Sequence, residues 1–547
     1  MRTILSDNNK FIKLQINEDK ILDQLSKMEG NIKRGLEPLK VREVFTLDTY
    51  NKILPVGSQP GRLYGLCKVH KENINDCPPL RPILSAINTP TYHLAKFLIP
   101  YLEPLTKNEY IVKDSFSFAE NVRKLDKNSF MTSFDINSLF TNIPLNETID
   151  ICIKLLYPSK NKKLNGISKD EFRLLLEIAT KESLFIFDNE YYSQLDGVAM
   201  GSPLGPTLAN VFLCFHEKSW LKTCPKQFKP KCYQRYVDDI FCLFENESHV
   251  NKFEKFINSR HKNITFTKEL EKESILPFLD ILITREEEGF VTSVYRKSSF
   301  SGIYLNFKSH VPMVYKYGLI YGLLHRTYMI CSNWQLIHEE INKLKGIWMK
   351  NKYPLGVINY CTRNFLNKLF IEKTDVTTVP KKEFSIILPF MGNDTILIKN
   401  RLNRFFKSEF PAFKLKFIIK SGRKIGSFFN FKDKIHTYVR SLVVYKYTCS
   451  NCNVTYLGKT KRHFKVRMCE HLGISHITGK PRKYNAKQTT AVKEHIRDSG
   501  HQGKFEDFKI ISNAVTNFEV LIKESLLIQK HNPVLNKQIK TFQLSLF

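Results

Sequence analysis

The chain has 547 residues, 42% of them hydrophobic and 12% aromatic, which is enough for several domains with sizeable cores. Its 84 lysines and arginines outnumber 53 aspartates and glutamates, and the resulting formal charge of +31 favours a polyanion partner, most simply nucleic acid. The alternative is a solvated basic surface. No run reaches the roughly 18 apolar residues of a membrane span and no signal peptide opens the chain, so we expect an intracellular protein with no membrane partner.

The run SFMTSFDINSLFTNIPL (129–145) contains the first acidic residue in an apolar setting. It predicts a strand that ends at Asp135, then a turn, with Phe140 near the start of a helix that begins around Pro144. Proline suits the first turn of a helix. A lone aspartate at a strand end is usually structural, so this run indicates a functional site only if other residues of the chain join Asp135.

The run DGVAMGSPLGPTLANVFLCFHEKSW (196–220) predicts an irregular loop followed by a helix. Gly197, Gly201 and Gly205, together with Pro203 and Pro206, account for the loop. Glycine lets the backbone approach a ligand closely. We therefore expect this loop to contribute to a site if one forms nearby.

The run KCYQRYVDDIFCLF (231–244) places Asp238 and Asp239 side by side within an apolar and aromatic stretch. Either the pair occupies a tight turn, which aspartate favours, or it holds a cation. Asp135 joins the pair if the two strands are neighbours in one sheet. Three carboxylates suit divalent cations that bind substrate phosphates and promote in-line phosphoryl transfer.

The blocks FDINSLFTNIP, GVAMGSPLGPTLANVFL and YVDDIF, in this order, resemble the palm motifs of reverse transcriptases. YGLCKVHK (64–71) and LRPILSAINTP (80–90) resemble the fingers motifs, and the similarity continues to ILPFLDILITR (275–285). The amino-acid sequences of the motifs GLCKVHK, SLFTNIPL and MGSPLGP are similar to those of Penelope-like retroelements. The resemblance implies an α+β right-hand polymerase with fingers, palm and thumb. Its partners would be an RNA template, a DNA primer or target, and deoxynucleoside triphosphates.

The resemblance also implies roles for individual residues. Asp135 and Asp238 would be the main ligands of Mg²⁺ or Mn²⁺, with Asp239 in support, and the pair would lie at a hairpin turn as well. The substrate-binding residues would be Lys68 and Arg81 at the triphosphate, Phe140 against the sugar 2′ position, Gly201 in the loop, and Tyr236 at the primer end. Lys71 is an alternative to Lys68, and the alternative for Phe140 is an ordinary core position.

The polymerase motifs set the expected domain boundaries. Residues 1–60 form an N-terminal segment that looks short for the family, so we expect a truncated start, and residues 61–289 form fingers and palm. Helical patterns rich in Lys, Tyr and His predict a thumb over 290–379. Residues 380–440 are predicted to be a linker whose basic clusters indicate either a nuclear-import signal or a solvated surface.

The C-terminal stretch, residues 441–547, carries a second pattern. Two short strands hold Tyr445 and Tyr456, and a following helix carries Arg467 and His471 one turn apart. Glu524 lies on a later helix that ends before Asn532 and Pro533, and Asn536 follows. In this order the residues resemble the GIY-YIG endonucleases, although the first motif lacks a glycine. The resemblance implies a small α/β nuclease in which Glu524 binds one divalent metal, Arg467 steadies the phosphate and a tyrosine helps to activate water.

Between the two nuclease strands lies CSNC, with Cys449 and Cys452, and KEHIRDSGH supplies His495 and His501 further on. Two thiolates and two imidazoles suit tetrahedral Zn²⁺ in a closed structural site, and Penelope-like nucleases carry such an insertion. The alternative is a hairpin with two ordinary cysteines. The other cysteines are scattered, as is typical of reduced intracellular thiols.

These patterns together predict a nuclear retroelement protein that nicks DNA and extends the freed 3′ hydroxyl on an RNA template. One alternative is a decayed or host-adopted copy that binds nucleic acid without catalysis. Another is an active polymerase joined to an inactive nuclease. The patterns do not indicate the oligomeric state.

Overall fold

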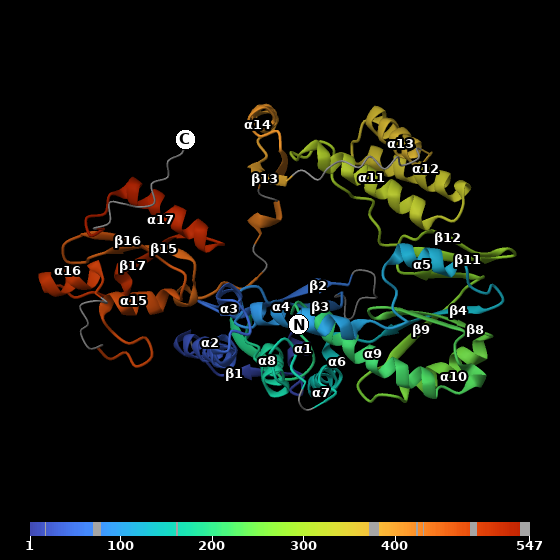
Figure 1. Cartoon of the computed structure of the whole chain (residues 1–547), viewed down its shortest axis with the longest axis horizontal. Helices are drawn as coiled ribbons and strands as arrows, with labels where there is room; N and C mark the ends of the chain where they lie inside the picture. The colour runs from blue at the N-terminus through green and yellow to red at the C-terminus, as the bar shows by residue number, and fades with distance from the viewer. Residues whose placement is uncertain are drawn as a thin grey trace.

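The computed structural model describes residues 1–16, 18–68, 78–159, 162–370, 382–422, 425–429, 432–481 and 489–536. Figure 1 shows a central α/β region, a helical bundle above its right side and a C-terminal domain on its left. Within the described ranges no helix is long and apolar enough to cross a membrane. Lys71, the alternative triphosphate ligand, lies outside them.

The first sheet has the strand order β1 (Phe11–Leu14), β6 (Glu190–Gln194), β5 (Phe185–Phe187), β2 (Gly61–Cys67), β3 (Leu80–Ser85). Residues 1–60, predicted as a segment of their own, belong to this body. β1 pairs with the edge of β6, and α2 (Glu18–Val41) buries one face in the main core through Ile32, Leu36 and Leu39. The physical reason is that an open strand edge and an apolar helix stripe both need partners.

The central sheet is antiparallel, with the order β7 (Cys232–Tyr236), β8 (Asp239–Phe244), β4 (Phe130–Ile136), β9 (Phe266–Leu270). β8 is apolar on both faces: Ile240 and Cys242 join one core cluster, whereas Phe241 and Leu243 join another. Successive side chains on a strand point to opposite faces, so both faces of this strand are buried. This explains the continuous apolar run after Asp239.

Helices cover both faces of the central sheet (Figure 1). α9 and α10 lie on one face and α5 on the other, where a smaller sheet of β10, β11 and β12 joins it. The bounds in this region are α5 (Ser115–Val122), α6 (Leu139–Asn142), α7 (Leu145–Leu156), α8 (Lys169–Lys181), α9 (Gly205–Thr223), α10 (Glu247–Asn258), β10 (Ile275–Phe278), β11 (Ile281–Glu286) and β12 (Gly289–Val294). Nearer the N-terminus lie α1 (Arg2–Leu5), α3 (Leu47–Ile53) and α4 (Tyr92–Leu102).

A helical bundle follows, made of α11 (Met313–Ile330), α12 (Trp334–Lys350) and α13 (Leu355–Phe370). It has its own core, in which Leu324, Leu344 and Trp348 are buried. Over the described part of the predicted thumb, residues 290–370, the helical patterns correspond to three helices, preceded by the last residues of β12; residues 371–379 lie outside the described ranges.

The stretch predicted as a linker contains a folded unit. β13 (Lys382–Pro389) and β14 (Phe413–Lys420) are parallel neighbours joined through α14 (Asn393–Glu409). Phe384 of β13 stacks on Phe406 of α14, with ring centroids 5.9 Å apart. Alternating apolar residues on two strands favour pairing over an extended connection.

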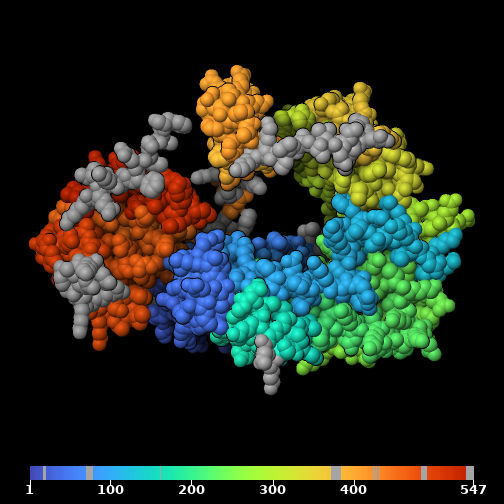
Figure 2. Space-filling model, viewed as in Figure 1, coloured from blue at the N-terminus to red at the C-terminus, as the bar shows by residue number. Residues whose placement is uncertain are grey.

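The C-terminal domain has the sheet order β16 (Thr455–Thr460), β15 (Val443–Thr448), β17 (Phe508–Asn513), with α15 (Phe464–Leu472), α16 (Ala491–Ser499) and α17 (Asn517–His531). It has a core of its own and also contacts the first sheet region. His463 Nε2 lies 2.6 Å from the carbonyl oxygen of Ser58, and Val439 is buried against Ile21 and Leu25 of α2. Figure 2 shows an opening between the first sheet region, the helical bundle and the 382–420 unit.

Candidate active sites

The two adjacent aspartates lie at a tight hairpin between β7 and β8. Tyr236 pairs with Asp239, so Val237 and Asp238 form the turn, and Val237 has φ +58°. Asp135 of β4 is the direct cross-strand partner of Asp239. The turn and the carboxylate cluster are therefore features of the same structure.

A cleft with a volume of about 930 Å³ opens over these carboxylates. Asp135, Asp238 and Asp239 line it, and so do four of the five predicted substrate-binding residues, namely Lys68, Arg81, Phe140 and Gly201. Tyr236 is not among the lining residues; it lies at the end of β7 and is 38% exposed. The strands and loops thus bring together predicted site residues that are up to 171 positions apart in the chain, from Lys68 to Asp239.

The carboxylates affect one another's ionisation. Burial, followed by the charges of Asp238 and Asp135, raises the pKa of Asp239 to about 6, while Lys297 opposes this rise. A divalent cation would offset this repulsion, and hard cations prefer carboxylate oxygens together with substrate phosphates. The residues present therefore fit a Mg²⁺ or Mn²⁺ site.

The Gly-rich loop forms one wall of the cleft and needs glycine for packing. Gly201 has φ +119°, and a Cβ there would lie 2.1 Å from the carbonyl oxygen of Leu84 on β3. Gly197 has φ +75°, and its Cβ would lie 2.6 Å from the carbonyl oxygen of Thr141. Any larger residue would push this wall away from its neighbours.

The sequence patterns missed two cations of this cleft. Lys10, just before β1, lines the cleft and donates a hydrogen bond of 2.6 Å to Asn142 Oδ1. Lys297 follows β12 and lines the cleft as well. No motif marks either lysine, because each reaches the cleft only through the packing of a distant segment.

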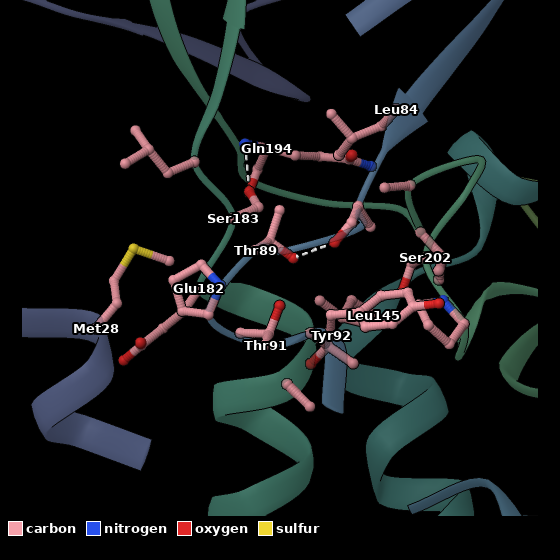
Figure 3. Close-up of a pocket in the computed structure, with 18 of the residues that line it drawn as sticks. Met28, Leu84, Thr89, Thr91, Tyr92, Leu145, Glu182, Ser183, Gln194 and Ser202 are labelled. Carbon is pink, nitrogen blue, oxygen red and sulfur yellow. Dashed lines mark hydrogen bonds between the residues drawn. The ribbon is translucent and has the colours of Figure 1, made fainter. Parts of the chain in front are cut away.

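A second, smaller cavity lies behind the Gly-rich loop (Figure 3). Its volume of about 40 Å³ holds a few water molecules at most, so it is too small for a nucleotide. Ser183 Oγ accepts a 2.8 Å hydrogen bond from the amide of Gln194 at its wall. We assign the substrate to the larger cleft.

Comparison with known families decides the identity of this region. A protein-family profile described as "Reverse transcriptase (RNA-dependent DNA polymerase)" matches residues 69–287. Residues 69–287 form a reverse transcriptase domain. Divalent metal, nucleic-acid template and primer, and nucleotides are typical of this family. A second profile, "Animal helix-turn-helix domain", matches residues 303–363, which contain α11, α12 and part of α13.

Solved structures similar to the chain include telomerase from Candida albicans in complex with a fragment of telomeric RNA, with 10% identity and a TM-score of 0.37 over 57% of this chain and 64% of that one. Apo telomerase from Candida tropicalis, truncated from its C-terminal domain, is 11% identical, with a TM-score of 0.33 over 44% of this chain and 56% of that one. The RNA-dependent RNA polymerase of a sicinivirus is 12% identical, with a TM-score of 0.35 over 58% of this chain and 71% of that one. The chain thus spans less than two thirds of the length of these telomerases. No curated protein matches it.

Neither family match reaches the C-terminal domain, where the structure gathers most of the predicted nuclease residues. Tyr445 is fully buried, and its hydroxyl lies 2.7 Å from His471 Nε2 and accepts a 3.1 Å hydrogen bond from Arg467 Nε. Burial and Arg467 lower the pKa of His471 well below its usual value, so its ring is neutral. Tyr445 can therefore donate to Nε2, while His471 Nδ1–H donates to Thr490 Oγ1 at 2.9 Å.

Tyr456 lies beside this network and is less buried than Tyr445. Gly458, two residues further on, allows this packing: a Cβ there would lie 2.6 Å from the Tyr445 hydroxyl and 2.7 Å from the Tyr456 ring. Burial raises the pKa of both tyrosines, most strongly that of Tyr445. Of the two, Tyr456 is the one that a bound water could reach.

Two other predicted nuclease residues already have protein partners. Glu524 of α17 forms an ion pair with Lys459 of β16. The Asn536 side chain clamps the backbone of Leu457, accepting from its amide and donating to its carbonyl oxygen, both at 2.8 Å. This geometry gives Asn536 a structural contact with β16, and a metal at Glu524 would have to displace Lys459.

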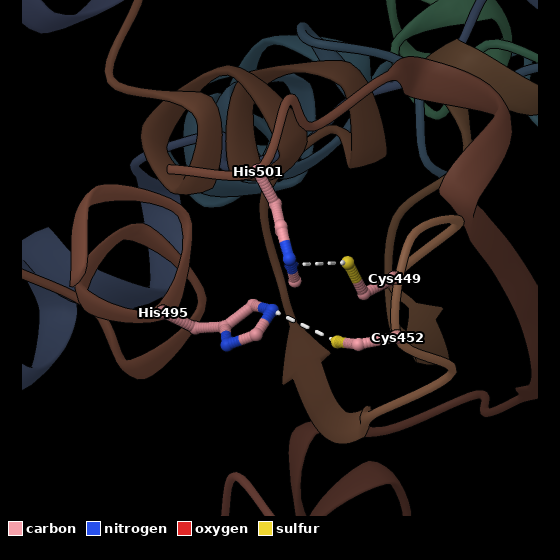
Figure 4. Close-up of side chains that lie close together, drawn as sticks. All are labelled: Cys449, Cys452, His495 and His501. Atoms are coloured by element: carbon pink, nitrogen blue, oxygen red, sulfur yellow. Dashed lines mark hydrogen bonds between the residues drawn. The ribbon is translucent and has the colours of Figure 1, made fainter. Parts of the chain in front are cut away.

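The four predicted zinc ligands converge in Figure 4. Cys449 Sγ lies 3.4 Å from His501 Nδ1, and Cys452 Sγ lies 3.5 Å from His495 Nε2. Donors about 2.3 Å (sulfur) and 2.0 Å (nitrogen) from a tetrahedral zinc ion are about 3.5 Å apart, so the spacing fits. Burial alone would raise the pKa of Cys449, but hydrogen bonds from His495, Asn451 and Cys452 lower it to about 6, which favours the thiolate ligand.

A second His and carboxylate cluster has a different character. Glu147 Oε1 lies 2.9 Å from His216 Nε2, and Glu147 Oε2 lies 3.2 Å from His261 Nε2. The amide of Asn263 donates to His261 Nδ1, so the ring proton of His261 is on Nε2 and points at Glu147. A nitrogen that carries a proton offers a metal no lone pair, and this group is a hydrogen-bonded clasp that joins α7, α9 and the loop after α10.

Proposed function

We propose that this protein is the reverse transcriptase and endonuclease of a Penelope-like retroelement. It nicks target DNA with residues 441–547 and extends the freed 3′ hydroxyl on an RNA template, which is target-primed reverse transcription. One observation carries the polymerase part: Asp135, Asp238, Asp239, Lys68, Arg81 and Phe140 line a single cleft of nucleotide size in a reverse transcriptase domain. The excess of basic residues supports a nucleic-acid partner and a nuclear location.

In the polymerase cleft the carboxylates of Asp135 and Asp238 would hold the divalent metal, and Asp239 would add negative charge beside them. When bound, divalent cations activate the primer hydroxyl and stabilise the leaving oxygen of the phosphoryl displacement. Lys68, directly after β2, and Arg81 of β3 line the same cleft and supply positive charge for the triphosphate. Lys10 and Lys297 add to this charge.

Phe140 selects the sugar. It lies in the segment that follows Asp135 and lines the same cleft. A bulky ring at the 2′ position excludes ribonucleotides by steric overlap. Tyr236, exposed at the end of β7, contacts the primer end from outside the nucleotide pocket.

The helical bundle binds the template–primer duplex as a thumb. Its position across the opening in Figure 2 and the match of residues 303–363 to a helix-turn-helix profile support this role. Basic side chains on such a bundle contact phosphates and position the duplex without reading its sequence.

In the nuclease, Glu524 would hold one divalent metal, Arg467 would contact the scissile phosphate and Tyr456 would orient the attacking water. Tyr445 and His471 act through their neighbours, because both are buried within the network that holds Arg467. Zn²⁺ held by Cys449, Cys452, His495 and His501 ties the β15–β16 connection to α16 and has a structural role.

A second candidate function is an active polymerase joined to an inactive nuclease. The ion pair between Lys459 and Glu524 favours it, since the proposed metal ligand is already paired with a lysine ammonium. The rate of plasmid nicking, measured against the concentration of divalent metal, separates the two. With an active nuclease the rate rises as the cation displaces Lys459, whereas with an inactive nuclease no nicking occurs at any metal concentration.

Primer extension by the purified full-length protein tests the proposal. An annealed DNA primer on an RNA template, with Mg²⁺ or Mn²⁺ and deoxynucleotides, should be extended, and a supercoiled plasmid should be nicked in the same buffer. Failure to extend with either metal, by a folded protein, would reject the polymerase assignment.

A further inference from the structure

The most completely buried large polar side chain beside the polymerase cleft belongs to Arg235, three residues before Asp238. Its side chain is 0% exposed, and that of its partner Glu217 is 1% exposed. Arg235 Nε donates to Glu217 Oε1 at 2.5 Å, and Nη2 donates to Oε2 at 3.2 Å. This is a bidentate ion pair sealed inside the protein.

Arg235 also reaches the turn that carries the catalytic aspartate. Its Nη1 donates to the carbonyl oxygen of Val237 at 2.9 Å and to Asn210 Oδ1 at 2.9 Å. Val237 is a β-branched residue at φ +58°, a conformation that such residues adopt only when the surroundings impose it. The guanidinium is the group that holds this carbonyl in place.

The other end of the contact is anchored on α9. Asn210 and Glu217 lie on α9, the helix that begins directly after the Gly-rich wall of the cleft. Tyr233 Oη and Asn108 Nδ2 donate to Glu217 at 2.9 and 3.1 Å, so both carboxylate oxygens are fully engaged. Asp238 is therefore tied to the same helix that positions the Gly-rich loop.

Stability alone does not account for such a pair. Replacing a buried ion pair by apolar residues of similar volume often leaves a protein as stable as before, or more stable. A pair retained at this place is better explained by the geometry that it imposes on the hairpin.

We infer that Arg235 is a positioning residue, which holds the Val237 carbonyl and so aims Asp238 at the metal-binding end of the cleft. The inference rests on the proposed polymerase function. Arg235 does not touch substrate, and acts on the metal through the turn.

The experiment compares the buried Arg235–Glu217 pair with a second Arg–Glu pair of the full-length protein, in which the arginine is partly exposed. Arg235→Met with Glu217→Met removes the positioning pair and leaves no uncompensated charge. The control is Arg285→Met with Glu271→Met, a pair in which Arg285 likewise donates to a backbone carbonyl, that of Ser129, but which does not line the cleft. Mn²⁺ affinity by electron paramagnetic resonance, assigned to the palm with Asp238→Asn, is measured beside primer extension and the melting temperature.

We expect the Arg235/Glu217 variant to stay folded and to bind Mn²⁺ about 10- to 100-fold more weakly, as for other groups that orient metal ligands. The control pair should change Mn²⁺ affinity less than about twofold. If the first variant does not fold, Arg235→Lys replaces it, because lysine keeps the charge but cannot contact Glu217 and Val237 together.

A folded Arg235 variant with unchanged Mn²⁺ affinity and unchanged extension would overturn the inference. A wild-type protein that binds Mn²⁺ at the palm but extends no primer would reject the proposed function instead. In that case the Mn²⁺ affinities still decide whether Arg235 positions the turn.

Discussion

The polymerase cleft and the C-terminal site both gather the residue types that metal-dependent phosphate chemistry needs, but they do so differently. In the cleft, three carboxylates face a volume of about 930 Å³, and burial, followed by the charges of Asp238 and Asp135, raises the pKa of Asp239 to about 6. In the C-terminal domain Glu524 is paired with Lys459, Asn536 clamps Leu457, and Tyr445 is buried in a hydrogen-bonded network.

The two sites differ in how far the protein itself neutralises the charges of the proposed metal ligands. In the cleft, Asp135 and Asp238 repel the charge of Asp239, and a bound cation would relieve this repulsion. In the C-terminal site the charges already have internal partners: Glu524 is paired with Lys459, and Arg467 is paired with Glu470 at 3.0 Å. Under the proposed nuclease function, metal and phosphate would have to compete with these partners.

The largest effect is expected for Asp238→Asn, which keeps size but removes a metal-binding charge. Primer extension should fall by about 10²–10³-fold or more, while the fold and plasmid nicking persist. Steady-state extension beside a circular dichroism melt checks this. A normal extension rate would show that Asp238 is not a metal ligand.

Glu524→Gln should abolish nicking yet leave extension of an annealed primer within about twofold, because sites in separate domains without shared partners act independently. Arg467→Ala should do the same by weakening phosphate binding. Synthesis on an intact plasmid should vanish in both variants and return on a pre-nicked plasmid. Loss of annealed-primer extension in a folded Glu524→Gln protein would contradict the division into two sites.

Cys452→Ser with His501→Ala should remove one zinc ion per chain and unfold the C-terminal domain selectively, because ligation free energy is also folding free energy. Metal analysis and limited proteolysis of the full chain provide the readouts. His216→Gln, at the Glu147 clasp, is the matched control and should leave the zinc content unchanged. A folded wild-type protein without zinc would contradict the assignment.

Phe140→Ala should admit ribonucleotides about 10- to 100-fold better, with a modest loss of deoxyribonucleotide use. Single-nucleotide extension with each nucleotide class measures the ratio. Unchanged discrimination would assign Phe140 to the core, where it packs beside the main cluster.

The smallest effect concerns pH. Since the fold raises the pKa of Asp239 from 3.8 to about 6, the metal-free protein should lose stability as pH rises from about 4 through 6. Asp239→Asn should therefore raise the melting temperature by about 2–4 °C at pH 7 and by nothing near pH 4. Melting temperatures of the two proteins at both pH values test this prediction. Saturating Mn²⁺ should remove the difference in melting temperature at pH 7.

The sequence by itself determined the local elements of both sites. The strand ending near Asp135, the Gly-rich loop with its helix, and the turn at Asp238 all follow from periodicity and turn chemistry over short distances. So do the strands holding Tyr445 and Tyr456 and the helices holding Arg467 and Glu524. The resemblance to family motifs implies the roles of these residues, but not their contacts.

Only the tertiary structure decided which of these elements meet. It placed Asp135 opposite Asp239, brought Lys10 and Lys297 into the cleft, and buried Arg235 against Glu217. It also folded 382–420 into a unit and paired Glu524 with Lys459. The physical reason is that these contacts join segments far apart in the chain, and their partners are selected by burial and charge compensation in the assembled fold, which no local pattern encodes.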